Sequence, residues 1–274
     1  MERRAGIHLD ATRDRFLAAR VREHMEERGI ASPMDLLGRI RSSNWEYETF
    51  LERLLTQETS FFRYPSVFSA LRNTVLKEMH ARKFWEDPRT LRVWSAGCAT
   101  GEEAYSIAIT IAEALMFVEA WDIEILATDI SAAALRRAEQ AVYPRRALAA
   151  LSPEQLDAHF TRAPGPDHWQ VRPRIRRLVR VAPMNLAEPV YAGRMDLIFC
   201  MNVLIYFSEQ RRHALVQRFY DALEPGGYLF LGHSESISKM PVKFQAIVLG
   251  DCIMYRKPTA EELQKSELVT EGRA

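Results

Sequence analysis

The feature that most constrains this chain is a Gly-rich turn that joins a short apolar run to a long apolar helix pattern. A strand is expected over Leu91–Ser95, the turn 96–101 reads AGCATG, and a helix is expected over Glu102–Val118. A strand, a glycine turn and a helix in this order bring backbone amides and a helix N-terminus to a ligand. Gly97 and Gly101 lack the Cβ atoms that would block its approach. The pattern predicts a nucleotide site in a doubly wound α/β sheet.

After residue 88, strand and helix patterns alternate, which is typical of a parallel sheet. Further strands are expected over Asp122–Ala127, Asp196–Met201, Tyr228–Gly232 and Ile247–Arg256, helices over Ala132–Gln140 and Glu209–Leu223, and a turn over Glu224–Gly227. The stretch Tyr143–Val181 interrupts the alternation and predicts a small antiparallel insertion with one helix, Pro153–Phe160.

The first 88 residues carry helical periodicity instead. Leu17, Val21 and Met25 recur on one helix face. More helices are expected from Ser32, from Ser43 or Asn44, and over Val67–Met79. We therefore expect an all-α domain and linker over residues 1–88, an α/β domain over 89–258 with its insertion at about 143–181, and a disordered tail over 259–274.

Asp129 follows the second predicted strand, where a carboxylate can accept hydrogen bonds from both ribose hydroxyls of a nucleotide. The alternative is that Asp129 caps the helix that starts at Ser131. The glycine turn is not GxGxxG, and Glu102 and Glu103 follow it at once. Negative charge there suits a cofactor with an amino group and a sulfonium, which favours S-adenosylmethionine (SAM) over NAD.

Charge and cysteine content exclude several classes of protein. The net charge of +1 predicts no general attraction to nucleic acid or membrane. Residues 136–180 contain ten arginines, no lysine and four acids, which is either a solvated face or a surface for an acidic partner. The three cysteines lack metal-ligand spacing, so we expect no metal, and Cys98 has no activating histidine nearby. Without a signal peptide or an apolar span, we expect a cytoplasmic protein with no membrane insertion.

Five motifs occur in order along the chain: TSFFR (59–63), WSAGCATGEE (94–103), MNL (184–186), Asn202 with IYF (205–207), and GHSES (232–236). Together they resemble the CheR-type chemoreceptor methyltransferases, over nearly the whole chain. The resemblance implies a class I (Rossmann-like) SAM methyltransferase domain with a small antiparallel β insertion, preceded by an all-α N-terminal domain. It also implies methyl transfer to glutamates of methyl-accepting chemoreceptors in chemotactic signal transduction, with S-adenosylhomocysteine (SAH) as product. The expected partner is the acidic helical cytoplasmic region of the receptors, the enzyme acting as a monomer.

The resemblance also implies a set of site residues. Gln57, Thr59 and Arg63 would contact SAM from the linker, beside Gly97 and Gly101. Glu103 would contact the amino acid end and Asp129 the ribose. The adenine side and the methionine moiety would be framed by Asn185, Leu186, Met201 and Asn202. Arg63 and Tyr206 would lie near the transferred methyl group as catalytic residues.

The chain departs from the family pattern in three places. Gln57 replaces an asparagine, Met201 stands where arginine is frequent, and Ala104 replaces a common proline. The Met201 change matters only if the residue contacts the ligand through its side chain. None of the three removes a group that the chemistry needs.

Carboxyl methylation needs few catalytic groups, because a glutamate with a pKa of about 4.3 is already ionised at neutral pH. Arg63 could hold that carboxylate through two hydrogen bonds; the alternative is a structural arginine at a helix terminus. His233 is expected to be a structural hydrogen bonder.

Two other functions are open. One is an RNA methyltransferase, which is disfavoured because no (Asp/Asn)-Pro-Pro-(Tyr/Phe) motif is present. The other is a regulatory module that binds SAM or a receptor without turnover.

Overall fold

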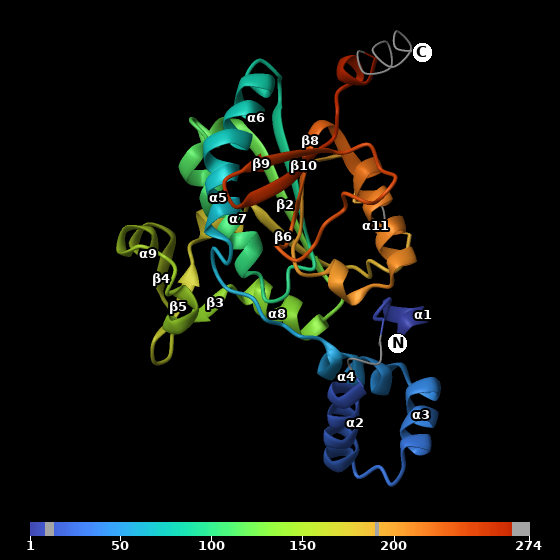
Figure 1. Cartoon of the computed structure of the whole chain (residues 1–274). Coiled ribbons are helices and arrows are strands. Elements are labelled where there is room, and N and C mark those ends of the chain that lie inside the picture. The colour runs from blue at the N-terminus through green and yellow to red at the C-terminus, as the bar shows by residue number, and fades with distance from the viewer. Residues whose placement is uncertain (9–13, 190–191, 265–274) are drawn as a thin grey trace, which may run out of the picture.

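A seven-stranded sheet forms the centre of the chain in the computed structural model, which describes residues 1–8, 14–189 and 192–264 (Figure 1). In spatial order its strands are β6 (Val179–Pro183), β2 (Trp121–Asp129), β1 (Arg89–Ala96), β7 (Met195–Cys200), β8 (Leu223–Leu231), β10 (Cys252–Arg256) and β9 (Gln245–Leu249). The first five are parallel, and β10 runs antiparallel to both β8 and β9. The predicted doubly wound α/β fold is therefore confirmed.

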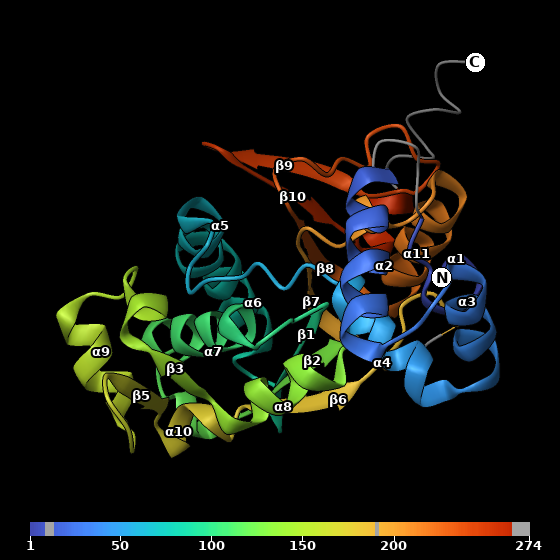
Figure 2. The ribbon, with the colours of Figure 1, turned by 90° about the horizontal axis from the view of Figure 1, so that it is seen from below.

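Helices cover both faces of this sheet (Figure 2). The helices are α1 (Glu2–Ala5), α2 (Asp14–Arg28), α3 (Pro33–Ser42), α4 (Asn44–Leu54), α5 (Pro65–Ala70), α6 (Leu76–Lys83), α7 (Glu102–Ala114), α8 (Ala132–Gln140), α9 (Pro153–His159), α10 (Pro173–Arg176) and α11 (Glu209–Ala222). Successive side chains of β1 point to opposite faces, so Val93 joins the core under α7 while Trp94 packs edge-on against Phe219 of α11. The strands nearest the site are thus buried on both faces.

Two smaller units flank the sheet. Helices α2, α3 and α4 form a domain whose core includes Ile30, Leu36 and Phe50, and it lies at the bottom of Figure 1. Ser32 and Ser43 cap α3 and α4 as the sequence predicts. The antiparallel insertion is a separate sheet of β3 (Val142–Pro144), β5 (His168–Val171) and β4 (Phe160–Arg162). Residues 179–181 were predicted to belong to the insertion, but they lie in β6 and pair with β2 in the central sheet.

Several element boundaries differ from the predictions. The strand expected over Ile247–Arg256 is two strands, because the chain reverses at Gly250 and Asp251, with Gly250 at φ 57°. The turn expected over Glu224–Gly227 is a bulge within β8, since Leu223 already pairs with Met195 before it. Helix α7 ends at Ala114 rather than at residue 118. The helix expected over Val67–Met79 extends from α5 to α6 through a π-helical turn, Leu71–Val75.

The start of the predicted disordered tail is ordered. Residues 260–264 are helical, the Thr259 amide donates to Glu262, and Glu262 pairs with Arg256. The remaining tail residues, 265–274, lie outside the described part of the chain. Within that described part, no helix combines the length and the apolar character needed to cross a membrane.

Candidate cofactor and active site

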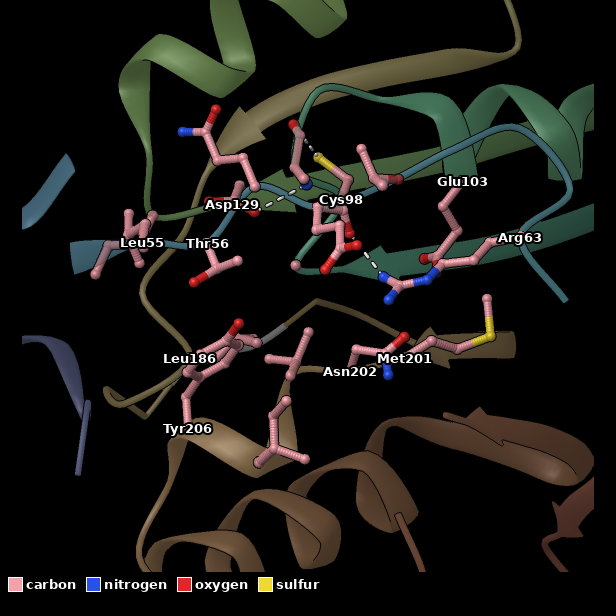
Figure 3. A pocket seen from close by; sticks show the side chains of 18 of the residues that line it. Leu55, Thr56, Arg63, Cys98, Glu103, Asp129, Leu186, Met201, Asn202 and Tyr206 are labelled. Atoms are coloured by element: carbon pink, nitrogen blue, oxygen red, sulfur yellow. Dashed lines mark hydrogen bonds between the residues drawn. The ribbon is translucent and has the colours of Figure 1, made fainter. Parts of the chain in front are cut away.

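A cavity opens at the carboxyl ends of β1, β2 and β7 (Figure 3). The chain leaves β1 toward β2 on one side and later returns to β7 on the other, so this is the switch point where open α/β sheets bind ligands. The linker between α4 and α5 runs across the cavity and contributes Leu55, Thr56 and Arg63 to its wall.

The Gly-rich turn lines the cavity on the β1 side. The amides of Gly97 and Cys98 both donate to the Thr128 carbonyl, at 2.8 and 2.9 Å, which ties the turn to β2. Gly97 has φ 86°, and a Cβ there would lie 2.4 Å from Val203 Cγ2. Only glycine therefore lets the loop after β7 approach the turn. The Cys98 thiol is buried and burial raises its pKa well above the usual value, so it is no nucleophile.

Asp129 stands at the end of β2 and faces the turn (Figure 3). Its Oδ2 accepts from the Ala99 amide at 2.9 Å and its Oδ1 from the Ser131 amide at 2.8 Å. Burial raises the pKa of this carboxyl, and the two amides lower it. Ser131, not Asp129, is the N-cap of α8, because its Oγ accepts from Ala134. The capping alternative for Asp129 therefore does not hold.

Glu103 is a half-buried acid in the first turn of α7. Its Oε1 accepts from the Ser95 hydroxyl at 2.7 Å. Burial raises the pKa of the Glu103 carboxyl to about 7, a rise that the Glu235 charge supports and that the Ser95 hydrogen bond and the Arg63 charge oppose. A cationic group entering the cavity would favour the ionised form of Glu103.

The linker residues are held from several sides. Arg63 Nη1 donates to the Glu58 carbonyl at 2.6 Å, and its guanidinium is directed into the cavity (Figure 3). It also lies 5.6 Å from the ring centre of Tyr64, the N-cap of α5, so the helix-terminus alternative stays open. Phe61 is fully buried between Tyr143 and Phe160 of the insertion, at ring distances of 4.9 and 5.5 Å. The linker is thereby anchored where it crosses the cavity.

Gln57 is fixed by the N-terminus of α8. Its Nε2 donates to Ser131 Oγ at 2.9 Å, and Glu52 of α4 accepts from Ser131 Oγ and from the Ala133 amide. One hydrogen-bonded cluster thus joins the helical domain to the wall of the cavity.

The loop after β7 forms the opposite wall. Asn202 has φ 62°, a left-handed conformation that asparagine tolerates better than most residues. Glu235 holds it there: its Oε2 accepts from the amides of Asn202 and Gly232, both at 2.8 Å, and its Oε1 from Ile205 at 3.3 Å. The Tyr64 hydroxyl donates to Asn202 Oδ1 at 2.7 Å. The loop that carries Tyr206 is therefore held in place from both sides.

Most of the residues expected at the site come together around this one cavity. Those that line it are Gln57, Thr59, Arg63, Gly97, Glu103, Asp129, Asn185, Leu186, Met201, Asn202 and Tyr206. Gly101 does not line it; a Cβ there would lie 2.9 Å from Ala138 Cβ, so this glycine serves the packing of α7 on α8. The Met201 side chain belongs to the buried core.

Several residues near the site were not predicted from the sequence. Ala5 and Ile7 line the cavity although they precede every recognised motif, and no local pattern marks them. Tyr64 and Glu235 lie beside or within quoted motifs, and their role emerges only from their contact with Asn202. His233 is exposed and packs its ring 4.4 Å from that of Tyr64.

Comparison with known proteins gives consistent matches. A family model described as CheR methyltransferase, SAM binding domain, matches residues 57–251. Chemotaxis protein methyltransferase 1 of Pseudomonas aeruginosa is 35% identical over 263 residues, covering 93% of this chain and 94% of that protein. Chemotaxis protein methyltransferase of Escherichia coli is 35% identical over 248 residues, covering 88% and 83%. The family match includes the linker, the Gly-rich turn and the loop after β7.

Proposed function

The chain belongs to the CheR methyltransferase family, and from this premise we propose that it methylates glutamate side chains of chemoreceptors. The observation that carries the proposal is a single cavity that combines two half-buried acids, Asp129 and Glu103, with one guanidinium, that of Arg63. Among the described residues that line this cavity there is no histidine, and its thiol, Cys98, has a raised pKa. Such a site can orient an acceptor carboxylate that is already ionised and therefore needs no general base.

SAM is the cofactor of this family domain, and it supplies an electrophilic methyl group on a positively charged sulfur. The residues present fit it. The Gly-rich turn lines the cavity through Gly97, Cys98 and Ala99, and the Asp129 carboxylate can accept from ribose hydroxyls. Glu103 can pair with the amino group, while Leu186 offers an apolar surface on the other wall.

We propose that Arg63, Asn202 and Tyr206 position the carboxylate of the acceptor glutamate. A guanidinium can bind a carboxylate through two parallel hydrogen bonds. Alignment of the reacting groups can reduce the barrier by about 7–11 kcal/mol, and this term requires no proton transfer. The Arg63 hydrogen bond to Glu58 and the Tyr64–Asn202 hydrogen bond hold both walls in place before the substrate arrives.

We propose acidic helical receptor segments as the partner. Exposed arginines on the insertion side, among them Arg136, Arg145 and Arg146, offer complementary charge.

Affinity for SAM should depend on pH through Glu103. Its pKa of about 7 means that the carboxyl is mostly protonated at pH 6 and mostly ionised at pH 7.5. If the ionised form binds the SAM ammonium, Kd should rise roughly eightfold from pH 7.5 to 6, with proton release on binding. Calorimetry in two buffers of different ionisation enthalpy would measure both effects. Glu103→Gln should bind more weakly and lose this dependence; a wild-type Kd that is flat across this range would contradict the assignment.

The reaction class is tested by transfer of labelled methyl from SAM to membranes rich in chemoreceptors. We expect label that alkali releases as volatile methanol, because a methyl ester hydrolyses to methanol and a carboxylate. Receptors with glutamine in place of the modified glutamates are the control and should remain unlabelled. Alkali-stable label would indicate methylation of an amine or a ring and would refute the proposal.

A further inference from the structure

The first eight residues, here called the N-terminal strap, lie across the edge of the cavity. Figure 1 shows α1 between the α2–α4 domain and the part of the molecule that contains α11. Ala5 and Ile7 are only 4% and 7% exposed, and both line the cavity. They belong to one apolar cluster with Tyr47 and Leu51 of α4, and Ile130 beside Asp129 packs against it.

The strap is attached to α4 and to the loops that carry Asn185 and Tyr206. The Asn185 side-chain amide donates to the Arg4 carbonyl at 2.5 Å, and the His8 amide donates to the Tyr206 carbonyl at 2.8 Å. The Arg4 guanidinium lies 3.5 Å from the centre of the Tyr47 ring. Two of these partners, Asn185 and Tyr206, are residues we assign to cofactor and substrate.

Where the strap packs on the rest of the protein, there is no space for a side chain at Gly6. This glycine has φ 74°, and a Cβ added to it would lie 2.5 Å from Phe207 Cε1 and 2.8 Å from Ala187 Cβ. Phe207 follows Tyr206, and Ala187 follows Leu186. The strap therefore packs directly on the two loops that form the wall of the cavity opposite the Gly-rich turn.

We propose that the N-terminal strap is part of the cofactor site, with Ala5 and Ile7 as an apolar wall that retains the nucleoside portion of SAM and SAH. The proposal rests on the SAM site described above and on no property of the receptor. A nucleoside base is flat and apolar on its faces, and the cavity offers it apolar side chains from the strap together with Ile130 and Leu186. Release of SAH then requires the strap to move, because it covers the edge of the cavity and is hydrogen-bonded to the loops that carry Asn185 and Tyr206.

The test is binding of SAH to the full-length chain, by calorimetry for Kd and by stopped-flow displacement for the dissociation rate. Gly6→Val should displace the strap and raise both quantities about tenfold. Ile7→Ala, which only shortens the wall, should raise both about threefold. Gly29→Val is the matched control, since Gly29 also has positive φ but has nothing within 4 Å of an added Cβ. It should leave SAH binding unchanged.

A second readout does not depend on the variants folding well. Hydrogen exchange of the wild-type strap amides should slow when SAH is added. The proposal is overturned if both strap variants bind SAH within twofold of wild type, or if strap exchange does not respond to SAH. Because no receptor is present, a failure of the glutamate assignment leaves these results unaffected. Asp129→Ala in the same assay shows that the measured binding is at this cavity.

Discussion

Replacing Arg63 by alanine should lower kcat/KM for receptor methylation by two to three orders of magnitude while the chain stays folded. A loss of this size corresponds to about 3–4 kcal/mol of transition-state stabilisation, which is reasonable for a residue that aligns a charged acceptor. The measurement is the initial rate of methyl transfer to receptor membranes, alongside SAH affinity and the thermal unfolding midpoint.

The structural reason is that Arg63 adds little to the fold. The side chain is exposed, and its hydrogen bond is to the Glu58 carbonyl within its own linker. A guanidinium next to the SAM sulfonium would be repelled by it. Arg63 donates to the Glu58 carbonyl, and its positive charge lowers the pKa of the Glu103 carboxyl. The guanidinium can therefore attract an incoming carboxylate, while the negative charge of Glu103 offsets part of its repulsion of the cofactor.

Two variants separate alignment from charge. Arg63→Lys keeps the charge but loses the planar fork, so it should recover only part of the rate. Arg72→Ala removes an exposed arginine that pairs with Glu113 outside the cavity, and it should leave the rate unchanged. A rate for Arg63→Ala within threefold of wild type would remove Arg63 from the mechanism.

The parallel arrangement of the sheet explains why the sequence predicted much of this site. The loops after β1, β2 and β7 must meet at the carboxyl edge because the three strands are parallel neighbours. A glycine turn, an acid and an asparagine at those strand ends are therefore close in space, whatever their separation along the chain. The alternation of strand and helix patterns predicted the parallel sheet itself, and β7 is buried along its whole length.

What the sequence could not predict depends on contacts that leave no local pattern. Arg4 and Asn185 are 181 positions apart, and nothing in residues 1–8 marks them as the edge of a cavity. Glu235 belongs to a quoted motif, yet its role depends on three amides that it reaches only after β8 is placed beside β7. The β9–β10 hairpin is a different case, because Gly250 and Asp251 are a local turn signal that was missed between two apolar stretches.

Asp129→Ala should raise Kd for SAM and SAH about 10- to 100-fold, since charge-assisted hydrogen bonds contribute roughly 1.5–3 kcal/mol. The variant also leaves the Ala99 and Ser131 amides without an acceptor, at a cost of about 1–3 kcal/mol, so some loss of thermal stability is expected. Ser152→Ala is the matched control: it removes an acceptor of backbone amides at the start of α9, far from the cavity, and should lower stability without changing Kd. Calorimetry with SAH distinguishes the two effects. An unchanged Kd for Asp129→Ala would restrict this carboxylate to a structural role at the turn.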